Sequence, residues 1–356
     1  MKKILLSLFA LCAATSLWAY DFQSGLLYYN ILNGDSTVEV TYESSKSGNY
    51  YNLTAVNIPE TVTYKGKTYT VVAIGNEAFT DCPDRAVYPS SYSYLNTSLK
   101  LVNIPKTVKT IGTFAFECCT ALTTINFLGD GLENIGGAAF TKCTALKSFE
   151  FPSTLKTIGS DAFSFSALSG SVTIPDDVTS IGPEAFESCS NLTSVTLGNS
   201  VTTLYYSIFK SCSSLTSVIL GNSVTTLSSN IFESCSSLIS VTLGNSIATI
   251  GEYAFNNCSS LPSITLPKSV RTIENNAFAN CSKLTTVYLK PTTPPAFTST
   301  NILPSCAKIF YVPCGASETY FLSDWVSFTT NFQEEECIKK YTIYVNQDCT
   351  SSVVEE

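Results

Sequence analysis

The sequence predicts a mainly β solenoid in which short repeats stack into one elongated domain. Three observations predict it: a fixed period of 23 residues, a phenylalanine at the same place in each repeat, and a short stretch of alternating apolar residues ahead of it. Intervals of 23 or 24 residues separate the phenylalanines of this column, which are Phe116, Phe140, Phe163, Phe186, Phe209, Phe232, Phe255 and Phe278. Phe79 begins the column, and the 37 residues from Phe79 to Phe116 equal one period plus an insertion of 14.

Residues 192–212 show how one repeat is expected to fold. The apolar side chains of residues 192–197 end in an alternating pattern, which indicates the main β-strand of the repeat. Pro or Gly follows directly, and either ends a strand, because Pro lacks a backbone N–H and Gly tolerates a turn. Residues 201–204 fit a second short strand. The motif Ala-Phe-x-x-Cys, as in residues 254–258, is expected to form a single helical turn that buries Phe.

The chain is expected to contain about ten such repeats with a cap at each end, because a lone repeat cannot bury its apolar face. The main strands are predicted at residues 53–58, 99–104, 122–127, 146–151, 168–174, 192–197, 215–220, 238–243, 261–266 and 284–289. The predicted parts are a signal peptide (1–19), an N-terminal β cap (20–52), the repeat array (53–290) with an insertion at 83–97, a C-terminal cap (291–336) and a tail without an assigned role (337–356).

The first 19 residues have the pattern of a secretory signal peptide. Two lysines follow Met1, residues 4–17 form an apolar run, and Ala19 is a small residue at a plausible cleavage point. The run is shorter than the roughly 20 apolar residues that span a membrane. We therefore expect an exported mature chain without a transmembrane span.

Composition argues against nucleic acid as a partner and against enzymatic activity. Lys and Arg number 20 against 28 Asp and Glu, which gives a formal charge of −8 and no basic patch for a phosphate backbone. The chain has no His, and no nucleophile-elbow motif or phosphate-binding glycine loop is present. No cofactor or metal is expected, and the acidic runs 176–177 and 334–336 are interpreted as solvated charge.

Cysteine follows the repeat. Of the 14 cysteines, eight lie three residues after the column phenylalanine: Cys82, Cys119, Cys143, Cys189, Cys212, Cys235, Cys258 and Cys281. Ser166 replaces the thiol in one repeat, so we expect buried, reduced thiols that pack as small apolar groups. Neighbouring strands are about 4.8 Å apart, which leaves disulfides between adjacent repeats geometrically open. The sequence does not assign the state of Cys118, Cys306, Cys314, Cys337 or Cys349.

The repeat pattern, carried by residues 192–212 and 250–258, resembles that of the BspA-like leucine-rich repeats of bacterial surface proteins. The resemblance covers residues 53–290 and implies a leucine-rich repeat solenoid. It further implies a secreted or surface-exposed protein of a Gram-negative, host-associated anaerobe, in a family where some members are adhesins toward host matrix proteins and cells.

The outward residues of the main strands are the candidate binding face, because they align in rows across the repeats. The candidate residues are Asn126, Glu150, Thr173, Thr196, Ile219, Thr242, Thr265 and Tyr288 in one row and Ser194, Ser217 and Ser240 in the next. Tyr88, Tyr92 and Tyr94 in the insertion are candidate loop contacts, since aromatic residues on protruding loops favour interfaces.

Two interpretations of this face remain open. In one, Ser and Thr simply suit exposed strands, and the array is a structural envelope or spacer protein without a specific ligand. The other interpretation is an adhesin-like scaffold that binds a protein or a glycan at the cell surface.

Overall fold

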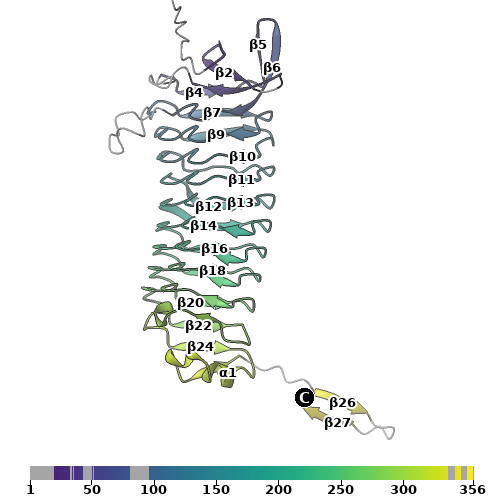
Figure 1. The fold of residues 1–356 in the computed structure, drawn as a ribbon, viewed down its shortest axis with the longest axis vertical. Helices are drawn as coiled ribbons and strands as arrows, with labels where there is room; N and C mark the ends of the chain where they lie inside the picture. Colours follow the sequence, from purple (N-terminus) through teal and green to yellow (C-terminus); the bar gives the residue numbers. More distant parts are fainter. Residues whose placement is uncertain are drawn as a thin grey trace, which may run out of the picture.

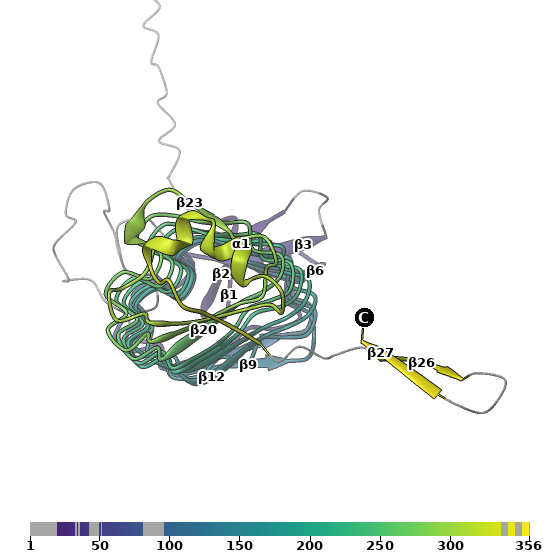
Figure 2. The same cartoon turned by 90° about the horizontal axis from the view of Figure 1, so that it is seen from below.

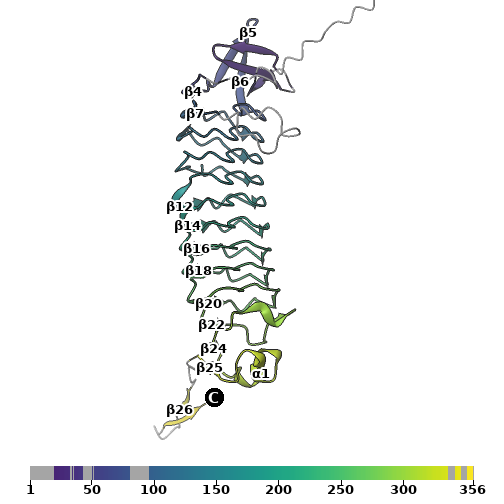
Figure 3. The ribbon, with the colours of Figure 1, turned by 90° about the vertical axis from the view of Figure 1, so that its left-hand side faces the viewer.

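The computed structural model is an elongated stack of coils, seen from the side in Figure 1. It describes residues 20–32, 34, 36–42, 50, 52–80, 96–335, 341–345 and 351–355. The main strands follow one edge of the stack (Figure 3), and a view along the stack places β9, β12 and β20 on the same side of the cross-section (Figure 2).

The second short strand of each repeat forms an unbroken parallel ladder. It belongs to a 14-stranded sheet in which each short strand pairs with that of the next repeat. The parallel strands are β6 (Lys67–Ile74), β8 (Thr110–Ile111), β10 (Asn134–Ile135), β11 (Thr157–Ile158), β13 (Ser180–Ile181), β15 (Thr203–Leu204), β17 (Thr226–Leu227), β19 (Thr249–Ile250), β21 (Thr272–Ile273) and β23 (Ala296–Phe297).

The main strands form three separate parallel sheets rather than one ladder. The first sheet contains β4 (Ala55–Asn57), β7 (Leu101–Pro105) and β9 (Thr124–Leu128). The second contains β12 (Ser169–Ile174), β14 (Asn191–Leu197), β16 (Ser217–Ile219) and β18 (Ser240–Thr242). The third contains β20 (Ser263–Leu266), β22 (Thr286–Leu289), β24 (Ile309–Val312) and β25 (Phe332–Glu334). The expected strand at 146–151 is therefore wrong, since those residues form no strand.

Aromatic bulk explains the first interruption. Residues 146–151 carry Phe149 and Phe151 where most repeats have Val, Ile or Leu. The Phe149 ring meets the rings of Phe140 and Phe163 edge-on, at centroid distances of 5.2 and 4.9 Å. Crossed rings here take the place of the in-register Val, Ile or Leu side chains that line the paired strands of other repeats. Strand pairing resumes only at β12, and its first residues shift register at Gly170.

Proline explains the second interruption, between β18 and β20. In the two preceding repeats, one residue near the start of the main strand donates its backbone N–H to the equivalent residue of the repeat before. These bonds run from Thr216 to Thr193 O (2.8 Å) and from Ile239 to Thr216 O (3.0 Å). Pro262 occupies the next equivalent position and has no N–H to donate to Ile239. The pairing of the main strands therefore stops there, whereas the short strands β19 and β21 of the same repeats still pair.

The turn that carries the column phenylalanine is not helical, which corrects the expected helical turn. In the segment around Phe116, Phe114 and Cys118 take left-handed φ angles of 61° and 58°. Hydrogen bonds of the i to i+3 kind, from Glu117 to Phe114 O and from Cys119 to Phe116 O (both 3.1 Å), make it a succession of turns. Residues at positive φ interrupt a right-handed helix, so the same spacing of apolar residues is achieved by consecutive turns.

The core of the solenoid is a continuous stack of phenylalanine rings. From Phe79 to Phe278, successive rings are nearly parallel, with centroids 4.9 to 5.7 Å apart. All nine side chains are fully buried. This stack fixes the spacing of the repeats along the axis, because every ring packs against both neighbours.

The two ends close the stack in different ways. At the N-terminus, β1 (Phe22–Ser24), β2 (Leu27–Ile31) and β3 (Thr37–Thr41) are antiparallel, β3 pairs parallel with β6, and β5 (Thr61–Tyr64) forms a hairpin with β6. At the C-terminus both ladders continue past residue 290 before the 3-10 helices η1 (Thr300–Ile302) and η2 (Asp324–Ser327) and the helix α1 (Ser317–Phe321) complete the last coil. The buried Trp325 donates from Nε1 to Pro295 O at 2.7 Å.

Residues 337–356, which the sequence left without an assigned role, include an antiparallel pair of strands. These are β26 (Tyr341–Val345) and β27 (Ser351–Glu355). Cys337 and Cys349 lie outside the described residues.

Candidate binding surface

The central sheet, β12 to β18, brings most of the predicted face residues together. The residues Ser171, Ser194, Ser217 and Ser240 are in register along one row, and Thr173, Thr196, Ile219 and Thr242 along the next. All eight are exposed or half-buried. Parallel partners in register point to the same side, so this sheet presents a flat surface of hydroxyl groups.

The hydroxyl groups of this sheet are placed by the strands rather than by an extended network of side chains. Ser171 and Ser194 hydrogen-bond to each other through their Oγ atoms at 2.7 Å. Thr216 Oγ1 donates to Thr193 O at 2.9 Å. No charged residue belongs to the two rows in this sheet, so the surface has little electrostatic steering of its own.

Two isoleucines interrupt the hydroxyl surface, and the sequence analysis found only one of them. Ile219 is 46% exposed and belongs to the predicted row. Ile239 is 55% exposed and lies just before β18, where Thr216 stands in the preceding repeat. A comparison of aligned repeats would have identified Ile239, because Thr or Lys occupies its position in most others. Exposed apolar side chains in the middle of a polar surface are typical anchors of interfaces.

The N-terminal sheet continues the row with amides instead of hydroxyls. Asn57, Asn103 and Asn126 are in register. Asn103 donates from Nδ2 to Oδ1 of Asn57, and Asn126 donates likewise to Asn103 at 2.8 Å. Glu150 is exposed in the interruption that follows and is separated from any paired strand. The predicted row positions from Asn126 to Tyr288 therefore do not form one uninterrupted surface.

The C-terminal sheet ends the row with an aromatic pair. Thr265 pairs with Tyr288, and Tyr288 with Tyr311, whose ring lies 4.9 Å from that of Tyr288 at an angle of 9°. The row predicted from the sequence ends at Tyr288 and does not include Tyr311. The strand–proline pattern at residues 309–313 was the available signal, but the intervening segment does not keep the 23-residue period.

A cleft of about 620 Å³ opens on the same side of the molecule at the interruption between β18 and β20. Its lining residues are Val241, Thr242, Leu243, Asn245, Thr265, Pro267, Lys268 and Lys290. Val241 is half-buried, whereas its equivalents Val195 and Val218 are buried. The missing strand pairing thus exposes part of the core and creates a recess that the sequence analysis did not predict.

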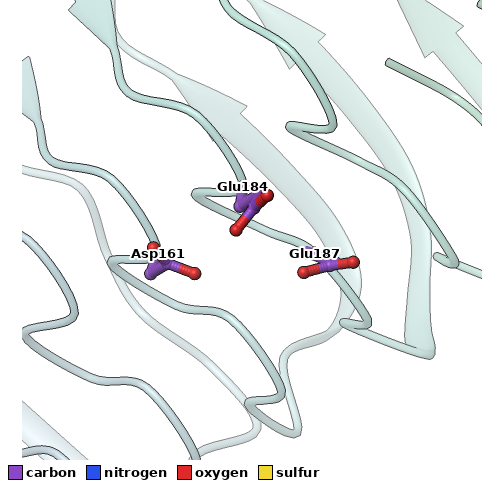
Figure 4. Close-up of side chains that lie close together, drawn as sticks. All are labelled: Asp161, Glu184 and Glu187. Carbon is purple, nitrogen blue, oxygen red and sulfur yellow. The ribbon is translucent and has the colours of Figure 1, made fainter. Parts of the chain in front are cut away.

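A separate acidic cluster lies among the turns that follow the short strands. One carboxylate oxygen from each of Asp161, Glu184 and Glu187 lies within 4.8 Å of the others (Figure 4). Burial and the neighbouring Glu184 raise the pKa of Asp161 to about 6. Asp161 and Glu184 occupy the same position of successive repeats, 23 residues apart, which was the sequence signal for this cluster. Exposed acidic groups commonly cluster without an ion, and the cluster is a source of like-charge repulsion.

The cysteine column is buried and reduced in the structure. All its members from Cys119 to Cys281 are free thiols, and Cys118 is free and buried as well. Each thiol from Cys143 onward donates to the carbonyl of a column phenylalanine in a preceding repeat, as from Cys235 Sγ to Phe209 O at 3.1 Å. Burial raises the pKa of Cys235 well above its usual range, so the thiolate that nucleophilic chemistry needs is disfavoured.

The remaining cysteines have different states or lie outside the described chain. Cys306 is a free, half-buried thiol, and Cys314 is disulfide-bonded. Cys82 and the loop residues Tyr88, Tyr92 and Tyr94 lie outside the described residues, so the loop contacts remain a prediction.

Within the described part of the chain, no helix combines the length and the apolar character needed to cross a membrane.

The continuous short-strand ladder, the phenylalanine stack and the outward strand rows define a leucine-rich repeat scaffold. The chain belongs to the BspA-type leucine-rich repeat family: six copies of the "BspA type Leucine rich repeat region" match residues 44–193 and 166–285. The sequence-based identification of the family and of the solenoid fold is thereby confirmed. No curated protein sequence matches the chain.

Solved structures of bacterial leucine-rich repeat proteins resemble the chain. A protein from Bacteroides ovatus is 27% identical with a TM-score of 0.41, over 89% of this chain and 100% of its own. A leucine-rich repeat protein from T. pallidum is 26% identical with a TM-score of 0.46, over 68% and 91% of the two chains. A leucine-rich cell surface protein from Faecalibacterium prausnitzii is 22% identical with a TM-score of 0.34, over 89% and 95%.

Proposed function

We propose that the chain is an exported, adhesin-like binding scaffold that recognises a protein partner through the face of β12 to β18. The observation that carries the proposal is the pair of in-register hydroxyl rows with Ile219 and Ile239 exposed among them. A flat, weakly charged surface with apolar anchors is suited to a protein interface of about 800 Å² on each side. The expected signal peptide at residues 1–19 supports export to the cell surface or the medium.

A specific partner distinguishes this proposal from a purely structural role as a spacer or coat. A spacer needs exposed, soluble strand positions but gains nothing from exposed isoleucines, which add no stability to the fold and favour association. Ile219 and Ile239 come from adjacent repeats of the same sheet, and both side chains are exposed.

The test is binding of the mature chain, residues 20–356, to immobilised fibronectin, laminin and collagen. Ser194→Lys with Ser217→Lys should weaken binding at least tenfold, because two bulky cations would stand on the interface. Thr225→Lys, an exposed position on the turn before β17, is the matched control and should leave binding unchanged. With few charges on the face, doubling the salt from physiological strength should change affinity less than about threefold.

The loop predicted to assist binding can be removed separately. Asn96 is buried, donates from Nδ2 to Phe79 O at 3.3 Å and accepts from the backbone of Leu99 at 3.0 Å, so it belongs to the scaffold. A deletion should therefore cover residues 83–95 rather than 83–97. Weaker binding with an unchanged melting temperature would support loop contacts. Binding that tolerates both the deletion and the paired lysines would contradict the proposed face.

A further inference from the structure

We propose that the cleft between β18 and β20 is a saccharide site for a sugar ring that carries a carboxylate. The site extends from the cleft across Thr265 to the ring of Tyr288, which lies beside the cleft and is not one of its lining residues. The hydroxyls of Thr242 and Thr265 are its hydrogen-bonding groups, and Lys268 is its cation. The site lies beyond the end of the β12 to β18 sheet, so it does not depend on the proposed protein interface.

The cleft originates from a single backbone position. Pro262 removes the backbone donor that would pair this repeat with Ile239, and β18 and β20 form no ladder. Val241 becomes half-exposed where its equivalents are buried, so the recess has an apolar floor. A recess produced by one backbone position is a permanent feature of the fold rather than a gap between mobile side chains.

The rings of Tyr288 and Tyr311 share one orientation. Tyr288 and Tyr311 come from paired strands, and their rings are parallel within 9° at a centroid distance of 4.9 Å. Since paired strands are about 4.8 Å apart, the ring planes stand across the solenoid axis. Tyr311 covers one face of Tyr288, and the opposite face is on the side of Thr265, which lines the cleft.

The space beside that face of Tyr288 sets the size of what fits against it. Thr265 is the in-register neighbour of Tyr288 and is exposed. Because its side chain is short, it leaves space for one further ring beside the ring of Tyr288. A ring placed there continues the aromatic stack at the strand spacing of about 4.8 Å. The apolar face of a pyranose has this thickness and packs well against an aromatic face.

The lining of the cleft is polar as well as apolar. Thr242, Thr265 and Asn245 offer hydroxyl and amide groups that both donate and accept hydrogen bonds, as a polyol ring requires. An aromatic side chain of a peptide would leave most of these groups unpaired, which is costly once water is excluded. The lining therefore favours a hydroxylated ring over an aromatic one.

The cleft also carries positive charge. Lys290 is paired with Glu335, whereas Lys268 is exposed and makes no ion pair within the described residues. Among the cleft residues no acidic side chain is present. An uncompensated ammonium beside a sugar-sized recess selects a carboxylate on the ligand, since charge-assisted hydrogen bonds are the stronger ones.

The experiment is calorimetric titration of the mature chain with matched pairs of sugars. The probes are glucuronate- and galacturonate-containing disaccharides, each with its neutral hexose analogue, which differs only at the carboxylate. The chain should bind at least one acidic disaccharide about tenfold more tightly than its neutral analogue. Tyr288→Ala should weaken binding of both members of the pair at least tenfold, whereas Tyr288→Phe, which keeps the ring, should stay within about twofold of the parent.

Lys268→Gln tests the charge separately. It should remove the preference for the acidic sugar and change the affinity for the neutral analogue less than twofold. Ser194→Lys, on the central sheet, should leave sugar binding unchanged, so failure here is distinguishable from failure of the protein interface. The proposal is overturned if no acidic disaccharide of the panel binds, if Tyr288→Ala has no effect, or if the peptide Glu-Tyr-Glu binds while the sugars do not.

Discussion

The short-strand ladder and the main-strand ladder share one repeat period but differ in continuity. The short ladder pairs without interruption from β6 to β23, while the main strands divide into three sheets. Each short strand has only two residues in most repeats, a polar one and a buried Ile or Leu, so little can vary there. The main strand is longer and tolerates Phe149 or Pro262 at the cost of its pairing.

The short strands and the phenylalanine stack hold the coils together, whereas the main strands vary from one repeat to the next. The phenylalanine stack and the short ladder keep the repeats in register across both interruptions. The main-strand face can then change from amides to hydroxyls to tyrosines without loss of the solenoid. In a linear repeat protein, neighbouring coils stabilise each other, so a local change on one face has mainly local consequences.

The largest expected effect comes from breaking the part that holds the coils together. Phe232 is fully buried between the rings of Phe209 and Phe255, at centroid distances of 5.7 and 5.3 Å. Phe232→Ala should lower the free energy of unfolding by about 3 to 5 kcal/mol, because it removes a large side chain and leaves a cavity. Urea denaturation followed by circular dichroism measures the change.

The matched control is Ser240→Ala on the face of the neighbouring strand, which should change stability by less than about 0.5 kcal/mol. Equal losses from Phe232→Ala and Ser240→Ala would contradict the assignment of the phenylalanine column to the core and of the serine row to the surface.

Features that keep the 23-residue period could be predicted from the sequence, whereas features that depart from it could not. The phenylalanine column and the cysteine column were predictable because each keeps one position of a fixed period. The helical turn was wrong because the Ala-Phe-x-x-Cys spacing matches both a helix and a pair of turns, and residues such as Phe114 at φ 61° decide between them. Left-handed backbone at non-glycine positions is held by the neighbouring coils, which a single repeat does not reveal.

The candidate site was only partly predictable for a related reason. The rows Ser194–Ser217–Ser240 and Thr196–Ile219–Thr242 followed from the period, and the structure has them in register. The cleft depends on one missing hydrogen-bond donor at Pro262 and on its effect on the adjacent repeat. Such an effect is a property of two coils in contact, and it becomes visible only when their pairing is known.

A smaller effect on stability is expected from restoring the pairing of the main strands β18 and β20. Pro262→Thr restores the residue type found at the equivalent Thr216 and Thr285 and adds a backbone donor for Ile239 O. A new hydrogen bond contributes about 0.5 to 1.5 kcal/mol, and the loss of the proline ring costs about 0.4 to 1 kcal/mol through the unfolded chain. The net change in stability should stay within about 1 kcal/mol.

The decisive measurement for Pro262→Thr is hydrogen exchange at the new amide of residue 262. Slow exchange would show that the ladder closes between β18 and β20, and sugar binding in the cleft should then fall. An amide at 262 that exchanges as fast as a loop amide would mean that the interruption has a cause other than the missing donor.

The smallest expected effect on stability comes from the acidic cluster of Asp161, Glu184 and Glu187, which lies beside the short-strand ladder. Removing one of its carboxylates measures the like-charge repulsion within the folded chain. Burial and Glu184 raise the pKa of Asp161 to about 6, above its ordinary value of 3.8. The protonated carboxyl therefore favours the folded state, and this contribution is fully present below about pH 4 and is lost as the pH rises through 6. Asp161→Asn should raise the melting temperature more at pH 8 than at pH 4. The difference should correspond to less than about 1 kcal/mol, because the carboxyl is partly solvated and screened.

A constant gain at both pH values is expected on top of this difference, since Asp161 has a left-handed φ of 56° and Asn tolerates that conformation well. Only the pH-dependent part reports the repulsion. Glu184→Gln should show a pH-dependent gain of the same sign, because it removes the charge that helps to raise the pKa of Asp161. If the melting temperatures of both variants differ from the parent by the same amount at pH 4 and pH 8, the carboxylates do not repel one another in the folded chain, and the short ladder carries no electrostatic cost at this cluster.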